Sequence, residues 1–375
     1  MKSKKIMKDY KLTAFDLFSG CGGFRLGAVN NGIEIIAHCE INRWAKTFYN
    51  NAFNPKHEAW YNDATKIKTD ELSDFNILLA GFPCQSFSIA GKRQGFEDSR
   101  GSLFFEVLRI LQDKRPEYFV LENVKGLLSI DNGKTFQTIL KLLSDIGIYS
   151  IEWAILNSKY FGVPQNRERI FIVGYPRIYG IGKIFPINCS TEYDNKSNKK
   201  THVIYWKNSC EKWKQEAKTT IGSLKTQTNL NRQFLIKAGT YRTYKDNKGM
   251  RITKDNTIPA IPARQREDGS GQPVICYPVL TPDRIEKRQK GRRIKKANED
   301  MFTLTGQDRH GVIIENRIRR LTPLECFRLQ GFPDEVFKKG SKGISDSQLY
   351  KMAGNSVTVN VVTKILEKIV NIERR

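Results

Sequence analysis

The chain has 375 residues, of which 39% are hydrophobic, and its 63 Lys and Arg exceed its 39 Asp and Glu by a formal charge of +24. This apolar fraction excludes a wholly disordered chain, and no apolar run approaches the ~18–20 residues of a membrane span. Seven Cys residues do not make a disulfide scaffold, and their odd number favours a reducing cytoplasm. No apolar stretch follows the Lys-rich start, so no secretory signal is expected.

The excess positive charge predicts a polyanionic partner, although a Lys-rich proteome would give a similar balance. Between Thr191 and Asp300, 25 basic residues stand against 12 acidic ones, which is a net charge of +13 out of +24. Nucleic-acid-binding proteins commonly concentrate basic residues in this way. The distribution therefore favours a nucleic acid as the partner.

Short apolar runs alternate with helical patterns in the first half of the chain. Strands of this kind, alternating with helices, indicate βαβ units around a mostly parallel sheet. The fold class is therefore predicted as α/β. The predicted strands are 11–18, 34–39, 75–80, 118–121, 151–156 and 169–174, and the predicted helices between them are 43–50, 102–113 and 134–145.

From about residue 177 to residue 315 this alternation is lost, and Gly, Thr, Asn, Lys and Arg become frequent. Either a long disordered insertion or a small, loop-rich second domain would give such a pattern. Aromatic residues among the basic ones and short apolar pieces at 234–236 and 312–314 favour the domain. Two helical patterns follow, at 322–330 and 357–370.

The first candidate site is a glycine-rich turn, Asp16-Leu-Phe-Ser-Gly-Cys-Gly-Gly-Phe24, between a predicted strand and a helix. Glycines at such a turn let the backbone approach a ligand closely. Glu40 ends the next predicted strand, where an acid can accept hydrogen bonds from ribose hydroxyls. The pattern indicates a nucleoside cofactor, and its glycine spacing differs from the G-x-G-x-x-G of NAD-binding proteins.

Three further motifs follow strand ends or flank a strand. They are Gly81-Phe-Pro-Cys-Gln-Ser-Phe-Ser88, Glu122-Asn-Val124 and Gln165-Asn-Arg-Glu-Arg169. Ligands bind beyond the carboxyl ends of strands in open α/β sheets, so Cys84 and Glu122 are candidate reactive groups. The alternatives are a packed Cys, a helix-capping acid and a solvated run of charges.

Taken in chain order, these motifs resemble those of the DNA cytosine-5 methyltransferases of the bacterial restriction-modification type. The resemblance covers about 11–175 and 317–365. It includes a mobile-loop motif at Gly95–Gly101 and closing motifs at Arg320–Pro333 and Gly354–Val357. Cys21 departs from the family pattern, which often has an aliphatic residue there. The resemblance implies an S-adenosylmethionine-dependent methyltransferase fold, with a Rossmann-like sheet and a smaller, loop-rich target-recognition domain.

The resemblance also assigns parts of the chain. Residues 1–176 would form the catalytic and cofactor-binding domain, 177–345 the target-recognition domain and hinge, and 346–375 a C-terminal helix that returns to the catalytic domain. The implied catalytic residues are Cys84, Glu122 and Arg169, and the implied substrate-binding residues are Phe82, Pro83, Gln85 and Arg167. S-adenosylmethionine would contact Phe18, Gly20, Gly22, Gly23, Glu40, Ile41, Asp63, Ala64, Leu103, Asn355 and Ser356.

These residues predict methyl transfer to carbon 5 of a cytosine flipped out of a short duplex DNA site, through a covalent Cys84 adduct. A tRNA cytosine-5 methyltransferase and a non-catalytic DNA-binding relic are the alternatives. The tRNA enzymes typically have Pro-Pro-Cys-Gln-Pro at the nucleophile loop, whereas this chain has Phe-Pro-Cys-Gln-Ser, which disfavours that alternative. The intact Cys84, Glu122 and Arg169 disfavour a non-catalytic relic. The expected protein is a cytoplasmic monomer that contacts no membrane, and it would serve alongside a cognate restriction endonuclease. No zinc-like Cys and His spacing occurs, so no metal is expected.

Overall fold

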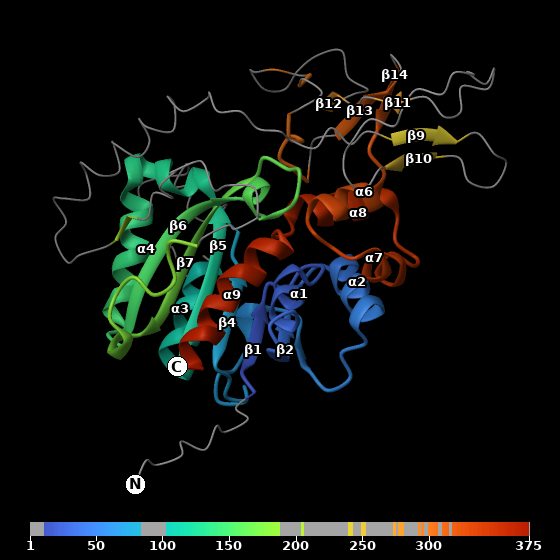
Figure 1. Cartoon of the computed structure of the whole chain (residues 1–375). Helices are drawn as coiled ribbons and strands as arrows, with labels where there is room; N and C mark the ends of the chain where they lie inside the picture. The colour runs from blue at the N-terminus through green and yellow to red at the C-terminus, as the bar shows by residue number, and fades with distance from the viewer. Residues whose placement is uncertain are drawn as a thin grey trace, which may run out of the picture.

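The computed structural model describes residues 11–83, 103–187 and 317–374, together with short pieces between them. Those pieces are residues 204–205, 239–242, 249–252, 273–274, 277–280, 292, 294–295, 299–306 and 310–314. Figure 1 shows a twisted sheet flanked by helices, with the C-terminal helix beside the first helix.

One eight-stranded sheet forms the centre of the molecule, in the order β3-β2-β1-β4-β5-β7-β6-β8. Strands β1 to β5 run parallel to their neighbours in this group, and β7 runs antiparallel to both β5 and β6. The prediction of an α/β fold with a mostly parallel sheet is therefore confirmed. The strands are β1 Thr13–Leu17, β2 Glu34–Cys39, β3 Ala59–Tyr61, β4 Ile77–Gly81, β5 Tyr118–Val124, β6 Tyr149–Asn157, β7 Glu168–Pro176 and β8 Ile204–Tyr205.

Helices cover both faces of this sheet. One face packs against α3 and α4 in a core that includes Phe15 and Leu121, and the other packs against α1 and α9 with Ala14 and Leu79. Strands covered on both sides read as continuous apolar runs, as in β4. The helices are α1 Gly23–Val29, α2 Arg43–Phe53, α3 Leu103–Lys114, α4 Lys134–Asp145, α6 Pro323–Leu329, α7 Asp334–Gly340, α8 Asp346–Asn355 and α9 Val359–Glu373.

The C-terminal helix α9 completes the core next to α1. A Cβ atom at Gly27 would lie 2.4 Å from Val362 Cγ1 and 3.1 Å from the backbone nitrogen of Thr363, so glycine permits the close approach. The side-chain amide of Asn31 donates a hydrogen bond to the Thr363 carbonyl at 2.9 Å. Segments from opposite ends of the chain therefore form one packed unit, although the division into three parts stays a prediction.

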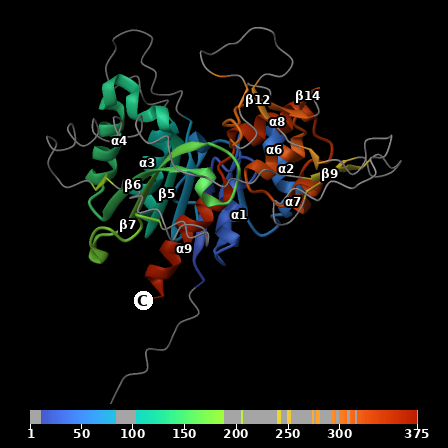
Figure 2. The ribbon, with the colours of Figure 1, turned by 45° about the horizontal axis from the view of Figure 1, so that its top comes forward.

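Helices α2, α6, α7 and α8 form a second packed group to one side of the sheet, as Figure 2 shows. The rings of Phe48 in α2 and Phe327 in α6 stack with their centroids 5.0 Å apart. Two three-stranded sheets lie beyond this group (Figure 1). Their strands are β9 Gly239–Arg242, β10 Gly249–Ile252, β11 Pro273–Val274, β12 Tyr277–Leu280, β13 His310–Ile314 and β14 Arg317–Arg320.

Candidate active site

A tight glycine turn joins β1 to α1. The backbone takes positive φ values at Phe18 (61°), Gly20 (55°) and Gly22 (88°). Glycine adopts such values without strain. A Cβ atom at Gly22 would lie 2.3 Å from Cε2 of Phe53, so this side of the turn is tightly packed. At Gly20, no atom of the described residues lies within 4 Å of the Cβ position. The turn is therefore held on one side and open on the other.

The carboxylate of Glu40 holds this turn in place. Its Oε2 accepts a hydrogen bond from the Gly20 backbone at 2.9 Å, and its Oε1 accepts one from the Asn42 backbone at 2.7 Å. Burial raises the pKa of Glu40, and the backbone hydrogen bonds oppose this shift. The apolar side chain of Ile41 is 69% exposed. An acceptor next to an exposed apolar surface is suited to the ribose and base of a nucleoside.

Asp63 and Ala64 follow the end of the neighbouring strand β3. Asp63 accepts hydrogen bonds from the hydroxyl and backbone of Thr65 at 2.8 and 3.0 Å, and these bonds lower its pKa. The Ala64 carbonyl accepts a hydrogen bond from Arg109 in α3 at 3.2 Å. Since α3 begins at Leu103, this contact ties the turn after β3 to the helix that carries Leu103.

The segment after α8 returns to the glycine turn. A Cβ atom at Gly23 would lie 2.8 Å from both Ser356 Oγ and Val357 Cγ1. Asn355, the last residue of α8, is exposed, whereas Ser356 is almost fully buried. Residues separated by more than three hundred positions in the sequence therefore meet at the turn.

These surroundings fit S-adenosylmethionine. The open side of Gly20 gives room for the backbone to approach a ligand, the Glu40 carboxylate has lone pairs left for ribose hydroxyls, and Ile41 offers an apolar surface for a base. Among the predicted cofactor residues, a hydrogen bond joins Gly20 to Glu40, Gly23 packs against Ser356, and the Ala64 carbonyl accepts a hydrogen bond from Arg109.

The predicted substrate loop begins at the end of β4. The carbonyl of Phe82 accepts a hydrogen bond from the Asn123 side chain at 2.9 Å, and Phe82 is buried whereas Pro83 is exposed. Gly81 pairs with Glu122 on the neighbouring strand β5. Cys84 and Gln85 lie outside the described residues, so their roles stay predictions.

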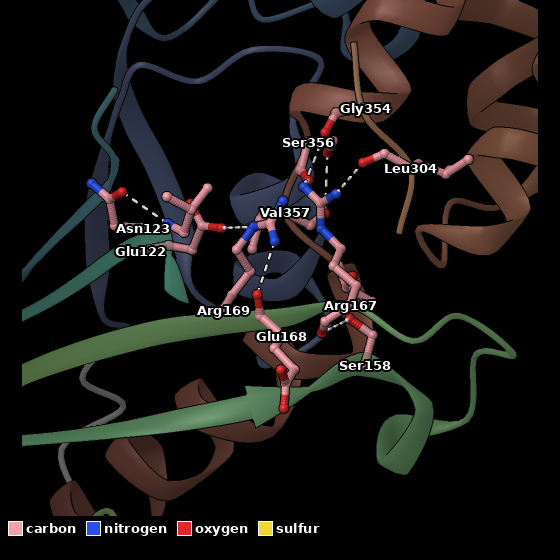
Figure 3. A network of polar contacts seen from close by, with 12 residues as sticks. Glu122, Asn123, Ser158, Arg167, Glu168, Arg169, Leu304, Gly354, Ser356 and Val357 are labelled. Atoms are coloured by element: carbon pink, nitrogen blue, oxygen red, sulfur yellow. Dashed lines mark hydrogen bonds and ion pairs between the residues drawn. The ribbon is translucent and has the colours of Figure 1, made fainter. Parts of the chain in front are cut away.

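Glu122 and Arg169 form a partly buried ion pair between β5 and β7, which Figure 3 shows from close by. Arg169 Nε lies 3.1 Å from Glu122 Oε1, and the two side chains are 15% and 13% exposed. Burial raises the pKa of Glu122, against the opposing charges of Arg169 and Arg167. A carboxyl that stays protonated to higher pH can deliver a proton, and the adjacent guanidinium can bind a neighbouring oxygen.

Arg167 points toward a different part of the protein (Figure 3). Its Nη1 donates to the Leu304 carbonyl at 2.7 Å, and its Nη2 donates to the carbonyls of Gly354 and Ser356 at 3.0 and 2.6 Å. The residue is 1% exposed. Burial lowers the pKa of Arg167, and the charge of Arg169 lowers it further. The structure thus joins Glu122 with Arg169 and directs Arg167 to backbone carbonyls.

Sequence reasoning assigned no role to two buried glutamines in the same region. The side-chain amide of Gln165 donates to the Leu329 carbonyl at 2.8 Å, and its oxygen accepts from the Leu304 backbone at 3.0 Å. The amide of Gln330 donates to the Ala353 carbonyl at 2.6 Å. Both glutamines belong to motifs quoted above, and a polar residue inside a motif was the only available signal.

The part of the chain that the structure describes contains neither a membrane-spanning helix nor a metal-binding cluster. No helix there combines the length and apolar character that crossing a bilayer requires. No group of three or more His, Cys, Asp or Glu side chains within those ranges is arranged to hold a metal ion.

Comparison with known proteins identifies a family and close relatives. A family model described as C-5 cytosine-specific DNA methylase matches residues 12–371. Orphan methyltransferase M.SPRI of Bacillus phage SPR is 35% identical over 430 residues, covering 96% of this chain and 98% of the relative. Type II methyltransferase M.HpaII of Haemophilus parainfluenzae is 36% identical over 369 residues, covering 96% of this chain and 91% of the relative.

Solved structures share the fold at low sequence identity. A DNMT2 mutant from Spodoptera frugiperda matches with a TM-score of 0.58 at 16% identity, covering 96% of this chain and 99% of that chain. The S. pombe Dnmt2 methyltransferase matches with a TM-score of 0.56 at 18% identity, covering 97% and 100%. The prediction of a methyltransferase fold is therefore confirmed.

Proposed function

Because the chain belongs to the C-5 cytosine-specific DNA methylases, we propose that it methylates carbon 5 of a cytosine flipped out of a short, specific duplex DNA site through a covalent bond to Cys84. It is an enzyme of the DNA cytosine-5 methyltransferase kind, and its methyl donor is S-adenosylmethionine. The observation that carries the detailed proposal is the partly buried Glu122–Arg169 pair beside the strand that leads to Cys84.

Cys84 is proposed as the nucleophile. Carbon 5 of cytosine is a weak nucleophile because it belongs to an aromatic ring. Addition of the Cys84 thiolate to carbon 6 breaks that aromaticity and gives carbon 5 enamine character. A free thiol has a pKa of ~8.5, so nearby cations are expected to increase the thiolate fraction.

Glu122 is proposed to protonate ring nitrogen 3 as the thiolate adds. The addition places negative charge on the ring, and a proton on nitrogen 3 neutralises it. Burial raises the pKa of Glu122, which favours the protonated form that this step requires. Arg169 is proposed to hold the exocyclic oxygen of the base, because its guanidinium is fixed by Glu122 and by the Glu168 carbonyl at 2.8 Å.

When bound, S-adenosylmethionine supplies an electrophilic methyl group on its sulfonium. The chain is proposed to orient it with the eleven residues that the resemblance assigns, which include the glycine turn and Glu40. After carbon 5 has been methylated, a base removes its proton and the Cys84 thiolate leaves, which restores the aromatic ring. No residue is assigned to that base.

The target base must leave the duplex before Cys84 can reach carbon 6, which costs roughly a few kcal/mol. Phe82, Pro83 and Gln85 are proposed to border the flipped base. The basic region within 177–345 is proposed to bind the DNA backbone and to read base edges in the major groove. Its net positive charge supports this assignment.

The biological setting is proposed from the relatives. One is named an orphan methyltransferase and another a type II methyltransferase. The type II relative supports the inference that this chain serves in a restriction-modification system with a cognate endonuclease, and we propose that it does so as a cytoplasmic monomer. Deleting the candidate endonuclease gene in a cell that lacks the methyltransferase should restore viability if the two act as a pair.

Two experiments test the proposed reaction. The purified protein should transfer labelled methyl from S-adenosylmethionine to duplex DNA, and transfer to RNA alone would instead favour the tRNA alternative. Duplex DNA carrying 5-fluorocytosine at the target should trap a covalent adduct, since fluorine blocks the elimination step. An active preparation that forms no adduct would contradict the addition of Cys84.

A further inference from the structure

Arg167 caps the C-terminal end of helix α8. The last carbonyls of a helix lack partners within the helix, and the helix dipole gives that end a partial negative charge. The carbonyl of Gly354 in the last turn of α8, and that of Ser356 directly after the helix, accept hydrogen bonds from Arg167 Nη2 at 3.0 and 2.6 Å. A buried guanidinium therefore compensates the end of a helix that lies 187 or more residues further along the chain.

The same guanidinium also holds a second segment. Its Nη1 donates to the Leu304 carbonyl at 2.7 Å, while the side-chain oxygen of Gln165 accepts from the Leu304 N–H at 3.0 Å. The N–H and the carbonyl of Leu304 are thus bound by the side chains of Gln165 and Arg167, which are two residues apart. A Cβ atom at Gly354 would lie 2.3 Å from the carbonyl carbon of Thr305, so the two held segments also touch directly.

The segment that Arg167 holds packs against the glycine turn. Arg167 binds the carbonyl of Ser356, and the hydroxyl of Ser356 lies 2.8 Å from the Cβ position of Gly23. Arg169, two residues further along the chain, pairs with Glu122. Residues 167–169 therefore have two roles. Arg167 supports the 354–356 segment, which packs on the glycine turn, and Arg169 pairs with Glu122, the predicted acid.

We propose that Arg167 is a positioning residue that fixes the 354–356 segment against the glycine turn for cofactor binding, and that it does not contact the target cytosine. The proposal rests on the proposed function, because it concerns the S-adenosylmethionine site. It replaces the substrate-binding role that the sequence motif alone indicated. With 1% exposure and three backbone carbonyls as acceptors, the side chain has no surface left for a base.

The test compares Arg167→Ala, Arg167→Lys and Arg169→Lys. Calorimetric titration with S-adenosylmethionine, without DNA, should give a dissociation constant about tenfold higher for Arg167→Ala, which corresponds to about 1.4 kcal/mol. Arg167→Lys keeps the charge and some of the donors, so it should recover part of this loss. Arg169→Lys should bind the cofactor as the wild type does. Since DNA is absent, the result does not depend on which nucleic acid is methylated.

Steady-state kinetics gives the second readout. Arg167→Lys should raise KM for S-adenosylmethionine and leave kcat at saturating cofactor and KM for DNA within about twofold of the wild type. If Arg167→Ala does not fold, the same comparison is made with Arg167→Lys alone. Unchanged cofactor affinity in the folded variants, or a loss confined to kcat and KM for DNA, would overturn the positioning role.

Discussion

Glu122 Oε1 and Arg169 Nε lie 3.1 Å apart across the boundary between the parallel strand β5 and the antiparallel strand β7. In this register Glu122 stands opposite Phe171, so Arg169 reaches it diagonally from two residues away. On the other side, the Cβ position of Gly81 in β4 lies 3.4 Å from Glu122 Oε2, an ordinary van der Waals distance. The carboxyl is therefore partly buried between two neighbouring strands and is oriented by Arg169.

The first prediction concerns the protonation of Glu122. Burial raises its pKa, so the protonated form persists to higher pH than for a free Glu, and kcat should fall as pH rises through that raised value. Glu122→Gln should lower kcat by about 10²-fold or more and remove this descending limb. A pH–rate profile at saturating DNA and cofactor measures both effects. A descending limb that persists in the variant would assign it to another group.

The second prediction concerns the guanidinium of Arg169. A Lys at this position keeps the charge but has no planar fork with which to bind Glu122 and a base oxygen together. Arg169→Lys should lower kcat by roughly 10²–10³-fold, the usual effect of removing one donor that stabilises developing charge. Single-turnover methyl transfer is the suitable measurement. Wild-type rates in this variant would exclude Arg169 from the reaction.

The third prediction concerns Cys84. Cys84→Ser should abolish turnover because a hydroxyl is far less ionised than a thiol at neutral pH, while DNA binding should remain. Methyl transfer and a gel-shift titration on the same preparation measure the two properties. Cys326→Ala, which changes a buried Cys in α6, is the matched control and should retain activity. Activity in Cys84→Ser would remove this residue from the mechanism.

The fourth prediction concerns the contact between α1 and α9. Gly27→Ala would place a methyl group 2.4 Å from Val362 Cγ1 and 3.1 Å from a backbone nitrogen, so it should destabilise the protein by about 1–3 kcal/mol. Gly126→Ala meets only Val124 Cγ2 at 3.9 Å and should stay within about 0.5 kcal/mol of the wild type. Thermal unfolding of the two variants compares them directly. Equal melting temperatures would show that α9 yields at this contact.

Much of the fold could be predicted from periodicity. The predicted strand 34–39 and helix 134–145 have the bounds of β2 and α4. Strand β3 was missed because it has three residues and two of them are exposed, and α8 was missed because its sequence is mostly polar. The antiparallel insertion of β7 between β5 and β6 depends on contacts between distant segments, which local patterns do not contain. The short apolar piece at 234–236 lies outside the described residues.

The candidate site was predictable to a different extent. Motif order indicated Glu122 and Arg169, and the structure pairs them. The orientation of Arg167 could not be predicted, because its acceptors are backbone carbonyls near residues 304 and 355, and a carbonyl leaves no mark in the sequence. The roles assigned to Cys84 and Gln85 remain predictions.

The packing of α9 against α1 has a consequence for biosynthesis. A ribosome makes β1 and α1 early, yet the apolar surface around Ala14 and Leu79 is only partly covered until residues 359–373 have been translated. The nascent polypeptide must therefore carry an unfinished core through most of its elongation, a state in which chains are prone to aggregate. Translation that stalls within the basic region would release a fragment that lacks Ser356 and Val357, the residues that pack against the glycine turn, so premature products should be inert and quickly degraded.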